Sequence, residues 1–312
     1  MELDRNYEYG DGFDANGIEI EKNITIDGKG HTIDAKGKSR IFYITGDNVT
    51  INNLVFINGN ATEGGAIYAA GQISLNNVTF ISNNASTGGA IYSKGKLTLN
   101  NNDFINNTAS DYAGAIDFYD DVLNCSNSNF IDNYAGQRGS SIYSTEATLN
   151  LCNSVVTSDR PSKYSHIVAS SSTVNINNSE FINISSDYAS ALTIEYSESS
   201  IINSRFVNLT AEKSAGAIFI KYPKNSYITG CEFINTKSFK NSGALMVDYA
   251  QELSTNATTL TDCVFNNASS MIGGAVIQLG GNLYLYNTNF TNNKARVGGA
   301  VYISFTNGTI NN

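Results

Sequence analysis

The sequence predicts an all-β fold, a right-handed, single-stranded parallel β-helix of about ten coils with roughly 25 residues each. The first supporting observation is the motif Gly64-Gly65-Ala66-Ile67-Tyr68, which recurs along most of the chain. From Ala66 its central position advances by 24, 25, 26, 25, 25, 26, 27, 31 and 25 residues, and a period of this length is typical of solenoids. The other two observations are a phenylalanine and an asparagine that recur with the same period. Right-handed winding follows from the general preference of parallel crossovers.

The recurring phenylalanine predicts the core. Every repeat but one has it, and Val156 takes its place in that repeat. In the glycine motif, side chains alternate between the two faces of a strand, so Ile67 is predicted to point inward and Ala66 and Tyr68 outward. Stacking of equivalent residues at the ~4.8 Å strand spacing would form a continuous core. The phenylalanines are Phe56, Phe80, Phe104, Phe130, Phe181, Phe206, Phe233, Phe265 and Phe290.

The recurring asparagine, three residues before the phenylalanine position, predicts a sharp corner in each coil. Asparagine and glycine tolerate the left-handed backbone that such a corner needs, and Gly230 takes the position once. Side-chain amides that stack in register can also hydrogen-bond from coil to coil. The predicted structural ladder consists of Asn53, Asn77, Asn101, Asn127, Asn153, Asn178, Asn203 and Asn287, with Asp262 in the remaining repeat.

Residues 1–40 lack the glycine motif and are predicted to form an N-terminal cap with the first turns of the helix. They contain short alternating segments, Ile18-Glu19-Ile20 and Ile24-Thr25-Ile26, and a turn-forming Asp-Gly pair. Residues 41–312 are predicted to form one continuous domain of repeats. Because the sequence stops in the middle of a coil, we expect a piece of a larger protein whose export signal and anchor lie outside it.

Composition excludes several classes of function. The chain has 19 basic and 28 acidic residues and a net charge of −9, which argues against a nucleic-acid partner. No apolar run is long enough to span a membrane. Four cysteines are too few for a disulfide framework. Cys231 and Cys263 share one register in adjacent coils, and both a disulfide and an unbridged stacked pair fit that spacing.

Two rows of tyrosines are the candidate ligand-binding residues. The first follows the inward aliphatic residue and is predicted to be exposed between small side chains; it contains Tyr68, Tyr92, Asp117 and Tyr143. The second row, three positions further along, contains Tyr196, Tyr222 and Tyr249. Exposed tyrosine rings stack well on sugars, so each row fits a ligand-binding strip. The simpler interpretation of each row is an aromatic ladder that only stabilises the sheet.

A cluster of acids is the candidate for metal binding or catalysis. Asp117, Asp120, Asp121 and Glu146 fall in the same coil or the next one, and Asp120 shares a register with Glu146. Three interpretations stay open: a solvated acidic turn, a calcium site built from carboxylate oxygens, and a carboxylate pair for glycoside hydrolysis. Calcium is the one cofactor that the sequence suggests.

The repeat motifs resemble those of a known group of proteins. Gly-Gly-Ala-Ile-Tyr paired with Phe-Ile-Ser-Asn (residues 80–83) or Phe-Ile-Asn-Asn (residues 104–107) resembles the repeats of methanogen (archaeal) adhesin-like proteins. The similarity to the repeats of chlamydial polymorphic membrane proteins is looser. The resemblance implies a pectate-lyase-like β-helix in a secreted cell-surface adhesin, and it carries over no catalytic residue, because the matching motifs are structural.

The predicted function is therefore that of a cell-surface adhesin segment that presents an extended β-helix face. The predicted partners are glycans or proteins on other cells or in the matrix, with neither nucleic acid nor membrane bound by this segment. The predicted location is extracellular, at the cell surface, and no enzymatic activity is expected. The alternatives are a polysaccharide lyase or glycoside hydrolase of the same fold, and a structural spacer.

Overall fold

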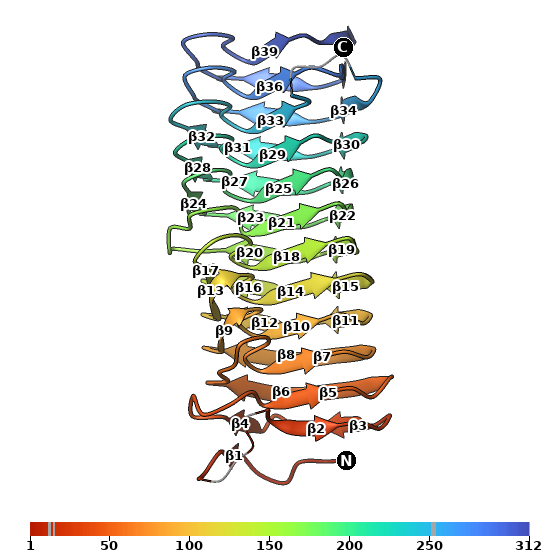
Figure 1. The fold of residues 1–312 in the computed structure, drawn as a ribbon. Helices are drawn as coiled ribbons and strands as arrows, with labels where there is room; N and C mark the ends of the chain where they lie inside the picture. Colours follow the sequence, from red (N-terminus) through yellow and green to blue (C-terminus); the bar gives the residue numbers. More distant parts are fainter. Residues whose placement is uncertain (12–13, 15, 251–253, 312) are drawn as a thin grey trace. The chain divides into compact units, whose positions relative to one another are not determined.

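The chain folds entirely into β-strands and turns within the part that the structure, a computed structural model, describes: residues 1–11, 14, 16–250 and 254–311. It forms two compact units, Met1–Asn150 (unit 1) and Leu151–Asn312 (unit 2). Neighbouring turns pair through parallel strands in both units. In each unit the chain winds as a right-handed helix of short strands (Figure 1). The predicted fold class is confirmed.

Each turn of unit 1 contributes to three sheets. The front sheet consists of β2 (Ile18–Ile20), β5 (Phe42–Ile44), β7 (Ile67–Ala69), β10 (Ile91–Ser93), β14 (Ile116–Tyr119) and β18 (Ile142–Thr145). The bent sheet consists of β1 (Tyr7–Glu8), β3 (Thr25–Asp27), β4 (Thr32–Asp34), β6 (Val49–Ile57), β8 (Ile73–Ile81), β11 (Leu97–Asn100), β12 (Asp103–Ile105), β15 (Val122–Ser126) and β16 (Asn129–Ile131). The short loop sheet consists of β9 (Asn84–Thr87), β13 (Thr108–Tyr112) and β17 (Tyr134–Ala135). The strand β19 (Thr148–Cys152) contains the boundary between the units.

Unit 2 repeats this plan. Its front sheet consists of β21 (Ile167–Ser170), β25 (Leu192–Glu195), β29 (Ile218–Lys221), β33 (Leu245–Asp248), β36 (Val276–Leu279) and β39 (Val301–Ser304). Its bent sheet consists of β20 (Val155–Thr157), β22 (Thr173–Asn177), β23 (Glu180–Ile182), β26 (Glu198–Ile202), β27 (Arg205–Val207), β30 (Ser226–Thr229), β31 (Glu232–Ile234), β34 (Ala257–Thr261), β35 (Val264–Asn266), β37 (Asn282–Tyr286), β38 (Asn289–Thr291) and β40 (Asn307–Asn311). Its loop sheet consists of β24 (Ser185–Ser186), β28 (Thr210–Ala211) and β32 (Lys237–Ser238).

The number of turns exceeds the prediction. The described residues place 12 strands in the front-sheet position, against about ten predicted coils. The two additional turns begin at β2 and β5, which lack the Gly-Gly-Ala motif on which the prediction was counted.

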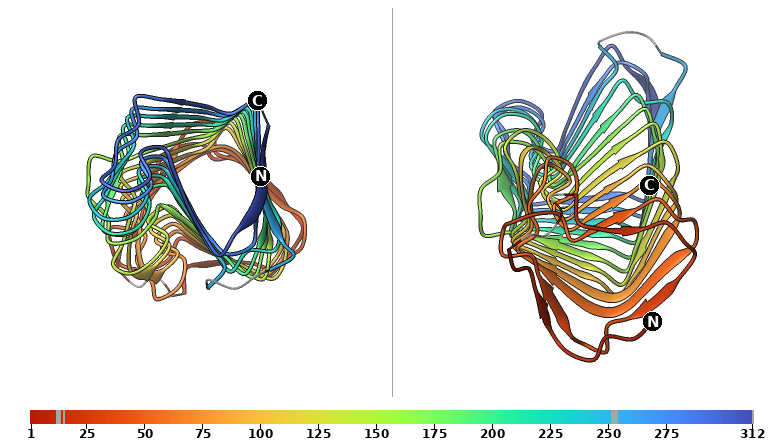
Figure 2. Two further views of the ribbon diagram at one scale, coloured as in Figure 1. Left: turned by 90° about the horizontal axis from the view of Figure 1, so that it is seen from above. Right: turned by 60° about the horizontal axis from the view of Figure 1, so that its bottom comes forward.

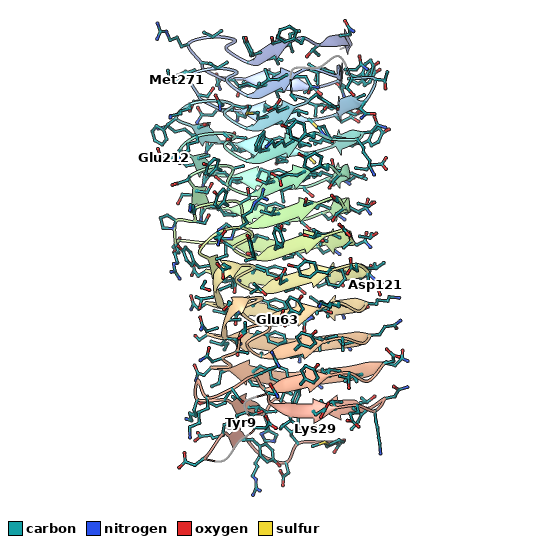
Figure 3. The ribbon with its side chains drawn as sticks, in the orientation of Figure 1. Tyr9, Lys29, Glu63, Asp121, Glu212 and Met271 are labelled. Carbon is teal, nitrogen blue, oxygen red and sulfur yellow. The ribbon has the colours of Figure 1, made fainter. Side chains whose placement is uncertain are left out.

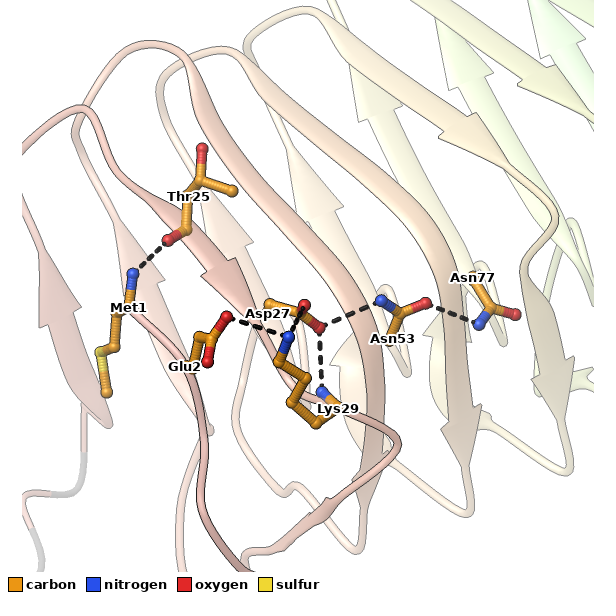
Figure 4. A network of polar contacts seen from close by, with 7 residues as sticks. All are labelled: Met1, Glu2, Thr25, Asp27, Lys29, Asn53 and Asn77. Atoms are coloured by element: carbon orange, nitrogen blue, oxygen red, sulfur yellow. Dashed lines mark hydrogen bonds and ion pairs between the residues drawn. The ribbon is translucent and has the colours of Figure 1, made fainter.

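Residues 1–40 continue the strand pairing of the repeats: β2 pairs with β5, and β3 and β4 both pair with β6. Figure 4 shows that the asparagine ladder also continues into this segment. Asn77 donates a hydrogen bond of 2.8 Å to Asn53, which donates one of 3.0 Å to Asp27. The Asn53 amide and Lys29, whose ammonium lies 3.0 Å from the carboxylate, lower the pKa of Asp27 to about 2. The assignment of a cap at 1–40 and of one domain at 41–312 stays a prediction.

The core consists of stacked phenylalanines, as the sequence predicts. In unit 1 the ring centroids from Phe56 to Phe130 follow each other at 4.9 to 5.2 Å. In unit 2 those from Phe181 to Phe290 follow at 4.5 to 5.0 Å. Such aromatic pairs contribute about 0.5–1.5 kcal/mol each beyond the burial of their surface. Val156 lies in register with Phe181 and is also buried.

The corner residues have the backbone that the asparagine register requires. All eight asparagines of the ladder have φ between 45° and 57°, and Gly230 and Asp262 share this left-handed conformation. Several side chains bond from turn to turn, as Asn101 does to Asn77 at 3.0 Å and Asn287 does to Asp262 at 2.6 Å. A second left-handed corner, which the sequence analysis missed, follows the phenylalanine at Asn58, Asn106, Asn183, Asn208, Asn235, Asn267 and Asn292.

The two glycines of the repeated motif are required for different reasons. The first, Gly64, has a left-handed φ of 61°. The second, Gly65, lies so close to the next turn that a Cβ would be 2.3 Å from the carbonyl oxygen of Gly89. Ala66, which was predicted to point outward, is fully buried.

The segments between the loop sheet and the front sheet form a second apolar layer outside the front sheet. In unit 2, Ala189 and Ala215 of these segments pack in one buried cluster with Met246 and Ile277 of the front sheet. Figure 2 shows these loops bulging from one corner of the coil in each unit. The outer face of the front sheet is therefore partly covered, which decides the exposure of the candidate site residues.

Candidate ligand-binding surfaces

The first tyrosine row lies on the outer face of the front sheet in unit 1. Parallel pairing places Tyr43, Tyr68 and Tyr92 directly above one another, and their rings stack at 4.9 and 5.3 Å. The guanidinium of Arg40 lies 5.5 Å from the Tyr43 ring and 5.2 Å from the Tyr68 ring. Its Nη2 donates a 2.6 Å hydrogen bond to the carbonyl of Glu63, which holds it over the rings.

This row is covered, so the prediction of an exposed strip is wrong at Tyr92 and Asp117. Tyr92 is only 7% exposed and Asp117 is fully buried, while Tyr68 and Tyr143 are half-buried. Tyr119 continues the stack on Tyr92 at 5.5 Å, and Tyr112 from β13 stacks on Tyr143 at 5.1 Å. The covering arises because the glycines of the motif let the loop lie directly against the strand backbone.

Asp117 is a buried acid with few partners. Its Oδ2 accepts a hydrogen bond of 3.3 Å from the Tyr119 hydroxyl. Burial raises its pKa to about 7, and the negative charge of Glu63 adds to the rise. The side chain is therefore largely uncharged below neutral pH. Because it has no exposed surface, it cannot touch a polymeric ligand directly.

The four predicted calcium ligands do not come together. Asp120 and Glu146 are exposed left-handed corner residues in successive turns, with φ of 65° and 54°. Asp121 accepts a 2.7 Å hydrogen bond from the backbone N–H of Val122, and Asp117 lies under the covering layer. Figure 3 shows Asp121 at the edge of unit 1, away from Glu63 on the front face. In the described part of the chain no three His, Cys, Asp or Glu side chains form a group able to hold a metal ion.

The second row contains a stacked pair, the exposed Tyr196 and the half-buried Tyr222, here called the corner tyrosine pair. Their rings stack at 4.9 Å with an interplanar angle of 27°, and Tyr196 is 53% exposed. Both residues have a left-handed backbone, with φ of 53° and 50°, which is rare for a bulky side chain. The ammonium of Lys221 lies 5.0 Å from the Tyr222 ring.

Tyr249 was predicted to belong with this pair and does not. It is only 5% exposed, and a Cβ at Gly281 would lie 2.6 Å from its ring. The reason is a shift of the corner by one residue, since the left-handed position in this turn is Ala250. Tyr249 and Ala250 lie in the 31-residue unit from Ala244 to Ala275, which is longer than the others.

The predicted alternatives for Cys231 and Cys263 resolve to unbridged thiols. Both are free and fully buried, and burial raises the pKa of Cys231 to about 12 and that of Cys263 to about 11. They occupy the position after the corner residue, where Ser204 stands in the preceding turn. Like the hydroxyl of Ser204, the thiol of Cys231 bonds to the carbonyl two residues before it, at 3.4 Å. The pair replaces corner serines and is not a crosslink.

The sequence analysis missed one set of aromatic and basic side chains beside the loop sheet of unit 2. Tyr164 and Tyr188 stack at 4.7 Å and 8°, and Lys213 lies 4.7 Å from the Tyr188 ring. The sequence gives no repeating pattern for these side chains, because they precede the glycine motif by varying numbers of residues. Only the pairing of the loop sheet reveals that they share a register.

One cavity lies away from all these residues, among the first strands of unit 1. It has a volume of about 690 Å³ and is lined mainly by apolar side chains, including Leu3, Ile20, Ile26 and Phe42. The residues that the sequence analysis singled out as ligand-binding do not line it.

Two short stretches of the chain match a known repeat family. Residues 77–94 and 287–304 match the Chlamydia polymorphic membrane protein repeat. Each stretch runs from a corner asparagine to the glycine motif, so the similarity lies in the positions that build the turn. The looser of the two resemblances noted in the sequence is thereby confirmed. The likeness to methanogen adhesin-like proteins stays a prediction.

Comparison with other proteins adds little about activity. No curated protein matches the chain. A solved structure described as "a new PL6 alginate lyase complex with trisaccharide" aligns over 98% of this chain and 89% of its own, with 13% identity and a TM-score of 0.33. A likeness this distant says nothing about activity or substrate. The described residues contain no helix long and apolar enough to cross a membrane.

Proposed function

We propose that this chain is a segment of a cell-surface adhesin that binds glycans or proteins on other cells or in the matrix. The observation that carries the proposal is the corner tyrosine pair. The two rings stack, with Tyr196 exposed and Tyr222 half-buried, and both residues have a left-handed backbone that bulky side chains rarely adopt. Strain of this kind concentrates at functional sites. Equivalent corners in other turns have the same left-handed backbone but carry the smaller or polar residues Asp120, Glu146 and Ser171, and Phe305 is a single exposed ring. The stacked pair of rings therefore distinguishes the corners at Tyr196 and Tyr222.

The chemistry of the pair suits recognition of a sugar or of an aromatic side chain. Exposed tyrosines supply a flat apolar face and a hydroxyl at a low cost in conformational entropy. Lys221 beside Tyr222 adds a donor for a hydroxyl or an anion. A single shallow pair of this kind binds weakly, so useful adhesion would come from many copies displayed on one surface.

The repeat matches support a location at the cell surface. The matched family is described as a membrane protein repeat, and its two matches cover residues 77–94 and 287–304. No enzymatic step is part of the proposal, and the absence of activity stays a prediction.

The test is a binding assay of the purified protein on a glycan array and on whole cells, with the double variant Tyr196→Asn/Tyr222→Asn. Asparagine favours the left-handed backbone, so the variant removes the rings without breaking the fold. The matched control is Tyr227→Ala/Tyr286→Ala, which removes two exposed tyrosines from the bent sheet of the same unit.

We expect binding by the wild type and the control, and a loss of about tenfold or more in the corner variant, since each stacking contact contributes about 1 kcal/mol or more. Equal binding by both variants would refute the assignment of the corner pair. Binding by none of the three proteins would favour a spacer. Release of reducing ends from the array glycans would favour the enzyme alternative.

A further inference from the structure

A second surface of unit 2 combines aromatic faces with ammonium groups. It lies beside the loop sheet, whose strands pair in register through Ser185, Thr210 and Lys237 (Figure 1). A bridge between Ser162 and Ser186 adds the preceding turn. The residues that follow these positions therefore lie above one another in four successive turns. We call this set the lysine–aromatic strip: Lys163, Tyr164, Tyr188, Lys213, Lys237 and Phe239.

The strip holds three aromatic rings that are partly accessible. Tyr164 and Tyr188 are half-buried and stack face to face, 4.7 Å apart and nearly parallel at 8°, so that ring edges, rather than the faces between them, are available for contact. Phe239 is 46% exposed, which is a large apolar surface to leave in water. The strand pairing gives Tyr164, Tyr188 and Lys213 one register, and Phe239 stands one residue nearer its strand in the following turn.

Each ring has an ammonium group close to its face. Lys163 lies 5.6 Å from the Tyr164 ring, Lys213 lies 4.7 Å from the Tyr188 ring, and Lys237 lies 4.0 Å from the Phe239 ring. Contacts of this kind hold a flexible lysine in place before a ligand arrives, which lowers the entropy cost of binding. The strip thus repeats the same arrangement three times: an aromatic ring with a lysine ammonium held beside it.

The charges around the strip favour an anionic ligand. Asp187 forms an ion pair with Lys213 at 3.6 Å, and Glu212 projects from the same edge of unit 2 (Figure 3). Lys163, Lys237 and Lys240 are exposed and have no ion pair among the described residues. Cations therefore outnumber acids on the strip.

The contrast with the rest of the chain strengthens this point. Residues 1–150 contain nine lysines and arginines and 18 aspartates and glutamates, which accounts for the net charge of −9. Residues 151–312 contain ten of each. An anionic polymer is repelled by unit 1 and meets a neutral unit 2 that carries a local excess of lysines.

We propose that the lysine–aromatic strip binds an acidic polysaccharide along the stack of turns. Sugar rings contact the accessible edges of Tyr164 and Tyr188 and the exposed ring of Phe239, and their carboxylate or sulfate groups contact Lys163, Lys213 and Lys237. A neutral glycan would leave the cations unused. The strip lies on elements other than the corner tyrosine pair, so it is independent of the function proposed above.

The test measures binding of the whole chain to polygalacturonate, heparin and neutral dextran by calorimetry, at low salt and at about 150 mM salt. We expect binding to at least one of the two acidic polymers, weakening as salt rises, and none to dextran. The two acidic polymers separate carboxylate from sulfate recognition. The triple variant Lys163→Gln/Lys213→Gln/Lys237→Gln should lose about tenfold or more in affinity and show a shallower salt dependence.

Two controls make the test decisive. The variant Lys22→Gln/Lys96→Gln/Lys224→Gln removes the same charge from exposed sites elsewhere and should bind as the wild type does. Tyr164→Leu/Tyr188→Leu should weaken binding several-fold, because the aromatic contacts with the sugar and the ring faces that hold Lys163 and Lys213 are lost. Equal losses in both lysine variants, or equal binding of double-stranded DNA with no effect of the tyrosine change, would overturn the proposal in favour of general charge attraction. The strip is judged by its own lysine and tyrosine variants and the corner pair by Tyr196→Asn/Tyr222→Asn, so failure of the strip does not decide the function of the corner pair.

Discussion

The tyrosine row of unit 1 and the corner tyrosine pair of unit 2 follow from the same kind of register, yet they differ in almost every physical property. The unit 1 row lies in strands, is clamped by Arg40 and is covered, so that Tyr92 is only 7% exposed. The corner pair lies just after its strands, has a left-handed backbone and exposes Tyr196 by 53%. Stacking alone therefore does not indicate function. The covering loops and the backbone conformation distinguish a tyrosine ladder that stabilises the sheet from a tyrosine pair that is accessible to a ligand.

The largest expected effect is on the covered region and depends on pH. The folded state holds a proton on Asp117 up to pH 7, whereas the unfolded chain releases it near pH 4. The contribution of the Asp117 carboxyl to the free energy of unfolding is thus fully present below about pH 4. It falls as the pH rises towards 7 and is lost above about pH 7. Asp117→Asn should raise the free energy of unfolding at about pH 8 by on the order of 3–4 kcal/mol and flatten its pH dependence. Urea unfolding at several pH values checks this, and an unchanged pH profile would contradict it.

The next effect tests what creates the cover. A Cβ at Gly89 would lie 2.2 Å from the carbonyl oxygen of Gly114 and 2.4 Å from that of Thr108, and neither backbone atom can move aside easily. Gly89→Ala should therefore cost about 3 kcal/mol or more in stability. Gly10→Ala is the control, because no atom lies within 4 Å of its added Cβ. Equal stability of the two variants in urea unfolding would show that the close approach is not required.

The smallest effect compares the two tyrosine sets directly. Tyr92→Asn should cost about 3 kcal/mol, since it removes a buried ring from a stack and leaves a polar group under the cover. Tyr196→Asn should change stability by less than about 0.5 kcal/mol, because relief of the left-handed strain offsets the lost stacking. Thermal unfolding of both variants measures the difference. A large loss at Tyr196 would mean that the corner pair serves stability after all.

Much of the architecture was predictable because it repeats. The phenylalanine, the corner asparagine and the glycine pair each act on the turn in which they stand and on the next turn, so local chemistry and period are enough to place them. The turns at β2 and β5 escaped the count because they use other residues for the same geometry. For Cys231 and Cys263, the shared register predicts that the two residues are neighbours. It does not predict whether their thiols form a disulfide.

The site residues were harder to predict, because exposure depends on segments far along the chain. Alternation identified Tyr68, Tyr92 and Asp117 as outward-facing, and only the folded loops decided that Tyr92 and Asp117 are buried. The displaced corner at Ala250 likewise removed Tyr249 from its row. The residues of the lysine–aromatic strip stand at different numbers of residues from the repeated glycine motif. Counting along the sequence therefore could not align them.

The sequence by itself determined the period, the stacking register and the core of this protein, because each of these depends on residues one turn apart. The tertiary structure alone decided which outward residues reach water, which acids are buried and which cations lie over aromatic rings. The physical reason is that the covering loops vary in length and pack by shape on a surface that the repeat does not encode. Binding depends on that surface, and the candidate sites therefore lie where the repeat is least regular.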